Sequence, residues 1–145
     1  MGPSKALRAL SGPTTLTLCT NMKEEEVINL TISSEKKERY LHLLANPNKR
    51  KKILDDLNHK PSLNLKYTTW HTSFDEALKS VKVNPKHEVY VISSAPQLDG
   101  KTMAYENAIS EIRHFGWGTI VGVTIDLAIY YGEGGERAAV INRSA

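Results

Sequence analysis

The chain has 145 residues, enough for one domain with a packed core. Hydrophobic residues make up 40% and charged residues 24%, which excludes a wholly disordered or fibrous chain, and the net charge of +3 is too small by itself to indicate nucleic-acid binding. The single cysteine, Cys19, excludes an internal disulfide, and no apolar run is long enough for a bilayer, so we expect a cytoplasmic protein without membrane contact.

Residues 1–21 differ in composition from the rest of the chain. They contain Lys5 and Arg8 but no acidic residue, and Ser, Thr, Gly and Pro occur throughout. Such a composition is typical of a tail rather than of a packed element. We therefore expect a disordered or extraneous extension over residues 1–21 and a single domain over residues 22–145.

The first part of this domain predicts one strand and two helices. Residues 27–32, VINLTI, alternate weakly between apolar and polar side chains and predict a strand. From Ser33 the apolar spacing becomes helical, with a face made of Tyr40, Leu41 and Leu44. A second helix begins at Asn46 and Pro47, because Pro suits the first helical position, and its buried face consists of Ile53, Leu54 and Leu57.

The middle of the chain predicts a strand, a helix and a second strand. Residues 63–70, LNLKYTTW, alternate and predict a strand with one face in water. Ser73 and Glu76 have the spacing of a capping box, and the helix that they begin has an apolar face of Phe74, Ala77, Leu78 and Val81. Residues 88–94, EVYVISS, are apolar at successive positions, so we expect a strand at the centre of the sheet with both faces covered.

The last part predicts a helix, a buried strand and a hairpin. Thr102 is the expected cap of a helix with an apolar face of Tyr105, Ala108, Ile109, Ile112 and Phe115. Residues 118–125 predict a second doubly covered strand, and residues 127–131 and 137–142 flank a glycine turn as a hairpin. The alternation of strands and helices favours an α/β fold, with α+β as the alternative. We predict one mixed sheet of five or six strands with about four helices, a parallel centre and a C-terminal antiparallel hairpin.

The stretch HFGWGTIVG, residues 114–122, places Trp117 between two glycines. If the helix ends at Phe115, Gly116 takes the left-handed position and Trp117 packs one turn back, on Ile112. Gly118 would then begin the strand at a close approach of two backbones. This interpretation favours a structural role for Trp117 over a ligand platform.

Four cations, Lys49, Arg50, Lys51 and Lys52, crowd the first turn of the helix that begins at Pro47. Each such charge at the positive end of a helix destabilises it by about 0.3–1 kcal/mol. Free helix N–H groups beside these cations would suit phosphate or an acidic surface, so we predict a protein or nucleic-acid partner here. The alternative is a solvated face relieved by ion pairs from Lys51 and Lys52 to the acids four residues on, Asp55 and Asp56.

A second candidate is the loop after residues 88–94, with Ser93, Ser94 and Asp99, since ligands collect at strand ends in α/β sheets. A small hydrolase using Ser94, Asp99 and His114 is the alternative function. No G-x-S-x-G turn surrounds the serines, so a non-enzymatic binding or regulatory protein is the leading prediction. The five histidines lack metal-ligand spacing, and no cofactor is predicted.

Two features of the C-terminal hairpin predict contacts with other chains. Tyr131, Glu133 and Arg137 lie near its tip and would form a rim for a partner. An uncovered edge of the hairpin would also allow pairing with a second copy of the chain. We therefore include a homodimer among the expected assemblies.

Four segments, NPNKRKKILDDLNH, VYVISSAPQLDGKTM, GWGTIVG and LAIYYGEGGER, together resemble a group of small bacterial proteins of uncharacterised activity. The resemblance spans residues 46–143. It implies a bacterial cytosolic protein and implies no mechanism. In that group a Pro-Gly pair precedes the LAIYY segment, where this chain has Ile125 and Asp126.

Overall fold

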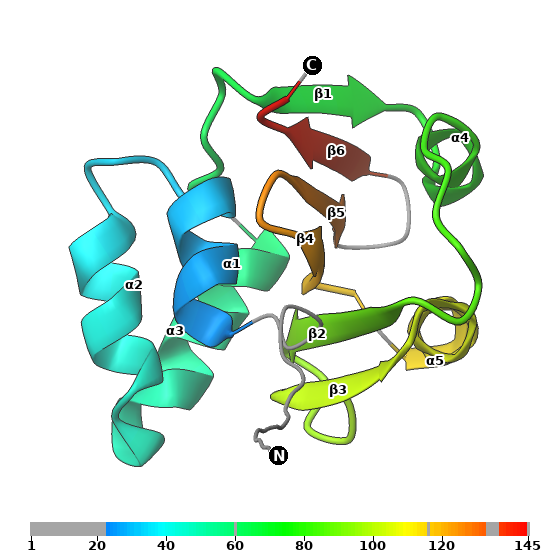
Figure 1. Ribbon diagram of the computed structural model, residues 1–145. Coiled ribbons are helices and arrows are strands. Elements are labelled where there is room, and N and C mark those ends of the chain that lie inside the picture. Colours follow the sequence, from blue (N-terminus) through cyan, green and yellow to red (C-terminus); the bar gives the residue numbers. More distant parts are fainter. Residues whose placement is uncertain (1–22, 60, 116, 133–136, 145) are drawn as a thin grey trace, which may run out of the picture.

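The computed structural model describes residues 23–59, 61–115, 117–132 and 137–144, and within them it has five helices and six strands (Figure 1). The helices are α1 (Glu24–Thr31), α2 (Lys37–Leu44), α3 (Pro47–His59), α4 (Phe74–Lys79) and α5 (Tyr105–Phe115). The strands are β1 (Thr68–His71), β2 (Glu88–Ser93), β3 (Lys101–Ala104), β4 (Thr119–Thr124), β5 (Leu127–Tyr131) and β6 (Ala138–Asn142). The expected single domain is confirmed.

All six strands form one sheet in the order β1-β6-β5-β4-β2-β3, and every neighbouring pair is antiparallel. The predicted parallel centre is therefore wrong. The cause is β3: residues 101–104 pair back onto β2 instead of capping a helix, so the chain reverses before α5 and enters β4 antiparallel to β2. Thr102 is accordingly a strand residue, and β2 lies next to the edge strand β3 rather than at the centre.

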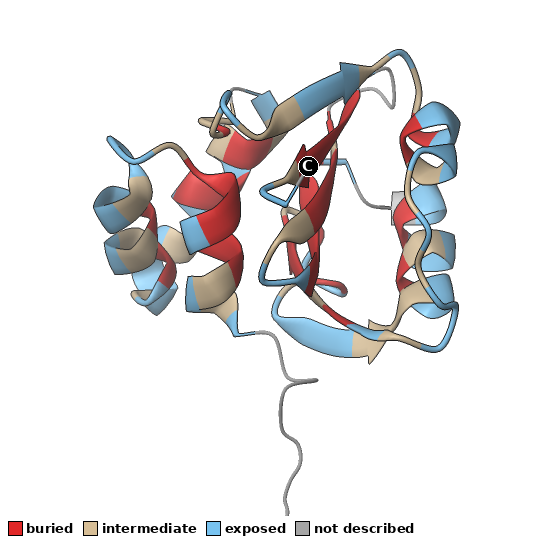
Figure 2. Ribbon diagram, turned by 45° about the horizontal axis from the view of Figure 1, so that its top comes forward, coloured by how far each residue is buried: buried red, intermediate tan, exposed pale blue. Residues whose placement is uncertain are grey.

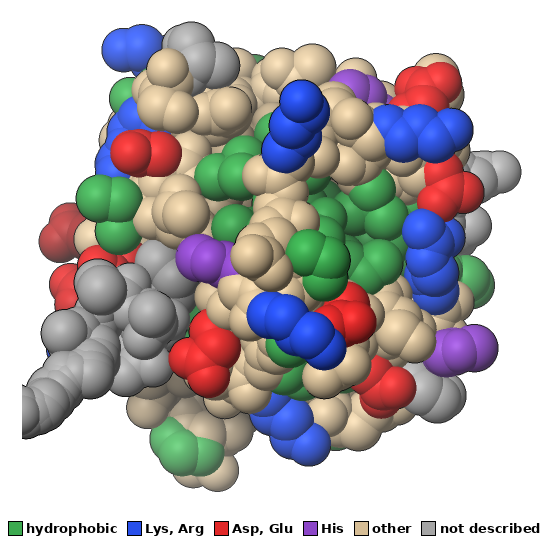
Figure 3. Space-filling model, turned by 45° about the vertical axis from the view of Figure 1, so that its right-hand side comes forward, with side chains coloured by type: hydrophobic (Ala, Val, Ile, Leu, Met, Phe, Trp, Pro, Cys, Tyr) green, Lys and Arg blue, Asp and Glu red, His purple; other side chains and the backbone are tan. Residues whose placement is uncertain are grey.

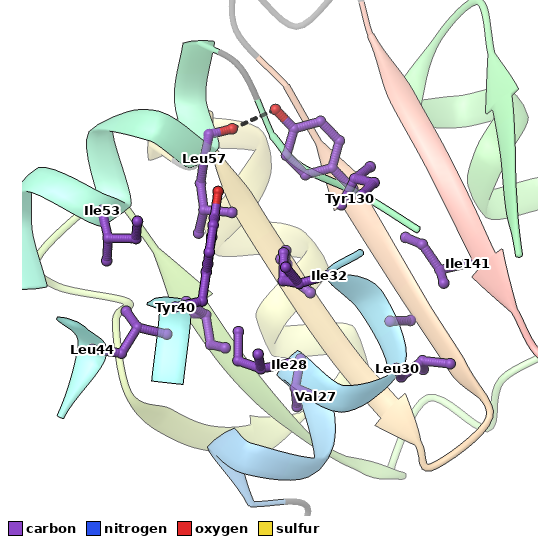
Figure 4. Close-up of a cluster of buried hydrophobic side chains, with 14 of the residues drawn as sticks. Val27, Ile28, Leu30, Ile32, Tyr40, Leu44, Ile53, Leu57, Tyr130 and Ile141 are labelled. Atoms are coloured by element: carbon purple, nitrogen blue, oxygen red, sulfur yellow. Dashed lines mark hydrogen bonds between the residues drawn. The ribbon is translucent and has the colours of Figure 1, made fainter. Parts of the chain in front are cut away.

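Helices cover both faces of the sheet, α1 to α3 on one side and α4 with α5 on the other (Figure 2). In β4, Ile120 faces the first layer and Val121 the second; in β5, Tyr130 and Ile129 divide in the same way. This arrangement explains the continuous apolar runs of β2 and β4, because both faces of these strands are buried. Figure 4 shows the core beneath α1 to α3.

Residues 27–31 are helical and Ile32 forms an isolated β-bridge with Leu63, so the expected strand over residues 27–32 is wrong. The buried residues of this helix are Val27, Ile28, Leu30 and Thr31, which fit a helix as well as a strand over so short a run. Glu26 supplies a helix-start signal, since its carboxylate accepts a hydrogen bond from the Lys23 N–H at 3.0 Å. The helix packs closely on the sheet at Gly122, where a Cβ atom would lie 2.4 Å from Val27 Cγ2.

Other local predictions are confirmed or corrected by single contacts. The hairpin of α2 and α3 is present, the Ser73 hydroxyl accepts from the Glu76 N–H at 3.1 Å, and β5 pairs with β6. Strand β1 is shorter than the strand predicted over residues 63–70, and Leu65 lies outside it with 76% of its surface exposed.

The terminal hairpin has no uncovered edge, because β1 pairs with β6 and β4 pairs with β5. The proposed route to a homodimer through that hairpin is therefore wrong.

Candidate functional site

A cleft of about 360 Å³ lies between α3 and the loop that connects β2 to β3. Helix α3 contributes Pro47, Arg50, Lys51, Leu54 and Asp55, and the loop side contributes Ser93, Ser94, Pro96 and Asp99. The structure thus brings together two regions that the sequence analysis treated as separate candidates, the basic helix start and the Ser-Asp loop.

Arg50 does not point toward solvent but is held within this cleft wall. Its Nε donates to Asp99 Oδ2 at 2.6 Å, and its Nη2 donates to Asp99 Oδ1 at 2.8 Å and to Glu24 Oε1 at 2.7 Å. Its Nη1 donates to Glu24 Oε2 and to the Leu44 carbonyl, both at 3.0 Å. All five N–H groups of the guanidinium are therefore occupied. The two carboxylates, Asp99 first, raise the pKa of Arg50, and it has no donor left for an external anion, contrary to its predicted role.

The two carboxylates are themselves fixed by the surrounding elements. Glu24 Oε1 accepts a second hydrogen bond from the Tyr90 hydroxyl at 3.0 Å, and Asp99 Oδ1 accepts from the Ser93 N–H at 3.1 Å. Burial and then the nearby charge of Glu24 raise the pKa of Tyr90 to about 12. Glu24, Arg50, Tyr90 and Asp99, here called the Arg50 cluster, thus join α1, α3, β2 and the loop.

The amino end of α3 is capped by its own chain. The Asn46 side chain accepts from the Asn48 N–H at 2.9 Å, and the Asn46 carbonyl accepts from the N–H groups of Lys49 and Arg50 at 3.0 and 2.9 Å. Pro47 has no N–H to offer. The free helix N–H groups expected at this end are therefore absent from the first turn.

Three lysines of the predicted cluster remain available to a partner. Lys49, Lys51 and Lys52 are exposed, and none of them has an ion pair with another described residue. In particular, the Lys51–Asp55 and Lys52–Asp56 pairs that the spacing allows do not form within 4.0 Å. The basic site consists of these three lysines without Arg50.

Ser94 links the cleft to Trp117. Its hydroxyl donates to the Trp117 carbonyl at 2.6 Å, and its N–H donates to the Gly118 carbonyl at 3.1 Å. Gly118 has φ +72°, and a Cβ there would lie 2.8 Å from Asn58 Cα, so the expected close backbone approach is confirmed. Trp117 is 49% exposed and Ile112 is buried, so about half of the Trp117 surface remains open to a partner, and its predicted contact with Ile112 stays a prediction. Gly116 lies outside the described residues.

The three residues of the hydrolase alternative do not share the cleft. Ser94 and Asp99 line it, with Ser94 donating to a carbonyl and Asp99 bound to Arg50. His114 lies in the last turn of α5, whose buried residues pack on the opposite face of the sheet, and it is not a lining residue. Ser93 bonds to the Thr119 hydroxyl at 2.7 Å and holds the loop in place.

Tyr131 and Arg137, two of the three residues predicted to form a rim at the hairpin tip, contact side chains on opposite faces of the sheet. Tyr131 is half-buried and stacks on Phe74 of α4, with ring centroids 4.3 Å apart. The Arg137 guanidinium lies over the Trp70 ring, 4.3 Å from its centroid, and Trp70 contacts Tyr130 of the other core. Glu133 lies outside the described residues.

A second hollow, of about 400 Å³, lies between α4 and α5, and Figure 3 shows hydrophobic side chains gathered on this face. Leu78, Val81, Val83, Tyr105 and Ile109 contribute most of its lining. Ion pairs join its walls, from Lys86 to Glu106 at 2.7 Å and from Arg113 to Asp75 at 2.6 Å.

Sequence reasoning missed Glu24, Tyr90 and the exposure of Trp117. Glu24 is one of three successive glutamates, and only its position at the start of a helix would have separated it from its neighbours.

Among the described residues, no group of three His, Cys, Asp or Glu side chains is placed to hold a metal, and no helix is long and apolar enough to cross a membrane. Comparison of the chain with family models, curated proteins and solved structures found no match.

Proposed function

We propose that this protein is a non-enzymatic binding protein that engages an anionic macromolecule at the start of α3. The observation that carries the proposal is that three neighbouring lysines are exposed and have no ion pair with another described residue. Lys49, Lys51 and Lys52 project from one helical turn without an ion-pair partner among the described residues, while Arg50 between them is turned inward.

The energetic argument follows from this arrangement. Three uncompensated cations at the positive end of a helix destabilise it, and a bound anionic partner would relieve that repulsion. The Arg50 cluster fixes α3 to α1 and β2, so the helix backbone that carries the lysines is already ordered before a partner binds. Because Lys51 also lines the cleft, a partner held by the lysines would lie over the cleft mouth.

The test compares two variants that each lose three positive charges. The α3 variant carries Lys49→Ser, Lys51→Ser and Lys52→Ser, and the control variant carries the same change at Lys79, Lys82 and Lys101, which are exposed elsewhere. Arg50 is left intact in both, because its removal would disturb the fold.

The probes are single-stranded RNA, single-stranded DNA, duplex DNA and poly-L-glutamate, titrated at several salt concentrations. We expect the wild type to bind, with an affinity that falls log-linearly with salt for nucleic acids. The α3 variant should lose affinity and about two units of the log–log salt slope for a single strand, while the control variant keeps both. Binding of no probe, or an equal loss in both variants, would refute the proposal.

A further inference from the structure

We infer that the anionic partner is a single-stranded nucleic acid, with one unpaired base in the cleft between α3 and the β2–β3 loop and another stacked on Trp117. The inference rests on the proposed function and names the partner class. It is carried by the chemistry of the cleft, by the exposed indole next to it, and by their spacing along α3.

The cleft has the mixed lining that a nucleobase needs. Its volume of about 360 Å³ lies in the range of small-ligand pockets, and Pro47, Leu54 and Pro96 offer apolar contact to the faces of a base. The Asp55 carboxylate is exposed and has no ion pair among the described residues, so it can accept from an exocyclic amino group such as cytosine N4. A polyanion held only by its charges would gain nothing from a carboxylate beside the lysines.

Trp117 supplies the second element of a single-strand site. Trp117 is 49% exposed, yet its carbonyl is bound by the Ser94 hydroxyl, and the adjoining Gly118 N–H donates to the Tyr131 carbonyl at 2.8 Å. An exposed aromatic ring on a fixed backbone is a stacking platform for bases of any sequence. Ser94 lines the cleft and also binds the Trp117 carbonyl, so the backbone of Trp117 is joined directly to a residue of the cleft.

The spacing of the features favours an extended strand over a duplex. Lys51 lies seven residues before Asn58, about 10 Å along the axis of α3, and Asn58 is the residue against which Gly118 packs. The lysines and Trp117 thus lie toward opposite ends of α3, with the cleft between them. A duplex keeps its bases stacked and paired, so it offers no open base face to Trp117 and no unpaired base that could enter the cleft.

The experiment measures fluorescence anisotropy with labelled (dC)12, (dT)12 and a 12-base-pair duplex. We expect single strands to bind more tightly than the duplex, and (dC)12 more tightly than (dT)12, because thymine has no exocyclic amino group. Trp117→Leu should weaken single-strand binding about tenfold, while Trp117→Phe retains most of it and duplex binding is unchanged. Asp55→Ala should bring the (dC)12 to (dT)12 affinity ratio to about one, even though it removes a repulsive charge.

A direct readout comes from the Trp70→Phe variant, in which Trp117 is the remaining tryptophan of the chain. Its emission should be quenched on binding of (dC)12 if a base stacks on the indole. If duplex and poly-L-glutamate bind as well as single strands, and Trp117→Leu changes nothing while the α3 lysine variant still loses affinity, this inference fails and the proposed function stands. If the wild type binds none of these probes, both fail.

Discussion

The guanidinium of Arg50 and the carboxylate of Asp99 form two parallel hydrogen bonds, from Nε to Oδ2 at 2.6 Å and from Nη2 to Oδ1 at 2.8 Å. The two side chains are largely buried, with exposed fractions of 21% and 14%, and they join α3 to the loop that forms the other wall of the cleft. A paired geometry of this kind is stronger than a single charged hydrogen bond. The same contact therefore shapes the cleft and withdraws one cation from it.

Replacing Arg50 by Met should lower the free energy of unfolding by about 2–4 kcal/mol. The change leaves the carboxylates of Glu24 and Asp99 beside each other without a counter-charge, and an unpaired charge in a partly buried site is costly. Lys52→Met, an exposed neighbour on the same helix, is the control and should change the value by less than about 0.5 kcal/mol. Urea unfolding measures both, and equal effects would contradict the assigned role of Arg50.

Two glycines with nearly the same backbone angle separate backbone strain from steric contact. Gly118→Ala should destabilise the protein by about 3 kcal/mol or more, because a Cβ would lie 2.8 Å from Asn58 Cα in addition to the strain at φ +72°. Gly100→Ala, at φ +76°, would meet only the Tyr90 hydroxyl at 3.8 Å, so it should cost only about 1–2 kcal/mol. Similar midpoints in urea for the two variants would argue against a tight backbone contact at Gly118.

Tyr130 donates a hydrogen bond to a carbonyl of α3 that cannot receive the usual helical hydrogen bond. Its hydroxyl donates to the Leu57 carbonyl at 2.5 Å (Figure 4), and the residue four positions after Leu57 is Pro61, which has no N–H to complete the helical bond. Tyr130→Phe should therefore cost about 1–3 kcal/mol, since it leaves a buried acceptor without this donor.

The control for this prediction is Tyr131→Phe. The Tyr131 ring stacks on Phe74, and its hydroxyl has no hydrogen bond with another described residue, so its removal should be nearly neutral in thermal or urea unfolding. Comparable losses in the two variants would show that ring packing, rather than the bond to Leu57, accounts for the effect.

The raised pKa of Tyr90 predicts a dependence of stability on alkaline pH. An unfolded tyrosine ionises near pH 10, whereas Tyr90 in the folded protein keeps its proton to about pH 12. Between these values the unfolded chain binds fewer protons than the folded chain, so the contribution of Tyr90 to stability falls as pH rises. The difference in unfolding free energy between wild type and Tyr90→Phe should be largest below pH 10 and shrink toward pH 12. A difference that stays constant from pH 9 to pH 11.5 would refute this.

The candidate site was only partly predictable from sequence. The run of cations and the Ser-Asp loop were recognised as separate features, and the structure places them on the two walls of one cleft. Nothing local distinguishes Arg50 from Lys49 or Lys51, because its inward orientation depends on Glu24 and Asp99, which lie 26 and 49 residues away in the chain. The Trp117 carbonyl is likewise bound by Ser94, which lies 23 residues away in the chain.

Interactions within a few residues fixed most elements of the fold in advance. The Asn46 cap, Pro47 at the first helical position and the Ser73 capping hydroxyl are present as expected, and the doubly apolar runs became buried strands. Such signals succeed because caps and periodic burial act over one or two helical turns or within one strand.

The sequence by itself therefore determined where helices and strands begin across most of the domain, and that helices would cover both faces of one sheet. Only the tertiary structure decided the directions of the strands and the composition of the site. Residues 101–104 are too short and too polar to identify as a strand until they pair with β2, yet that pairing reverses the chain before α5, so that β4 runs antiparallel to β2. The Arg50 cluster exists for the same reason: hydrogen bonds between elements far apart in sequence form only when packing brings those elements together.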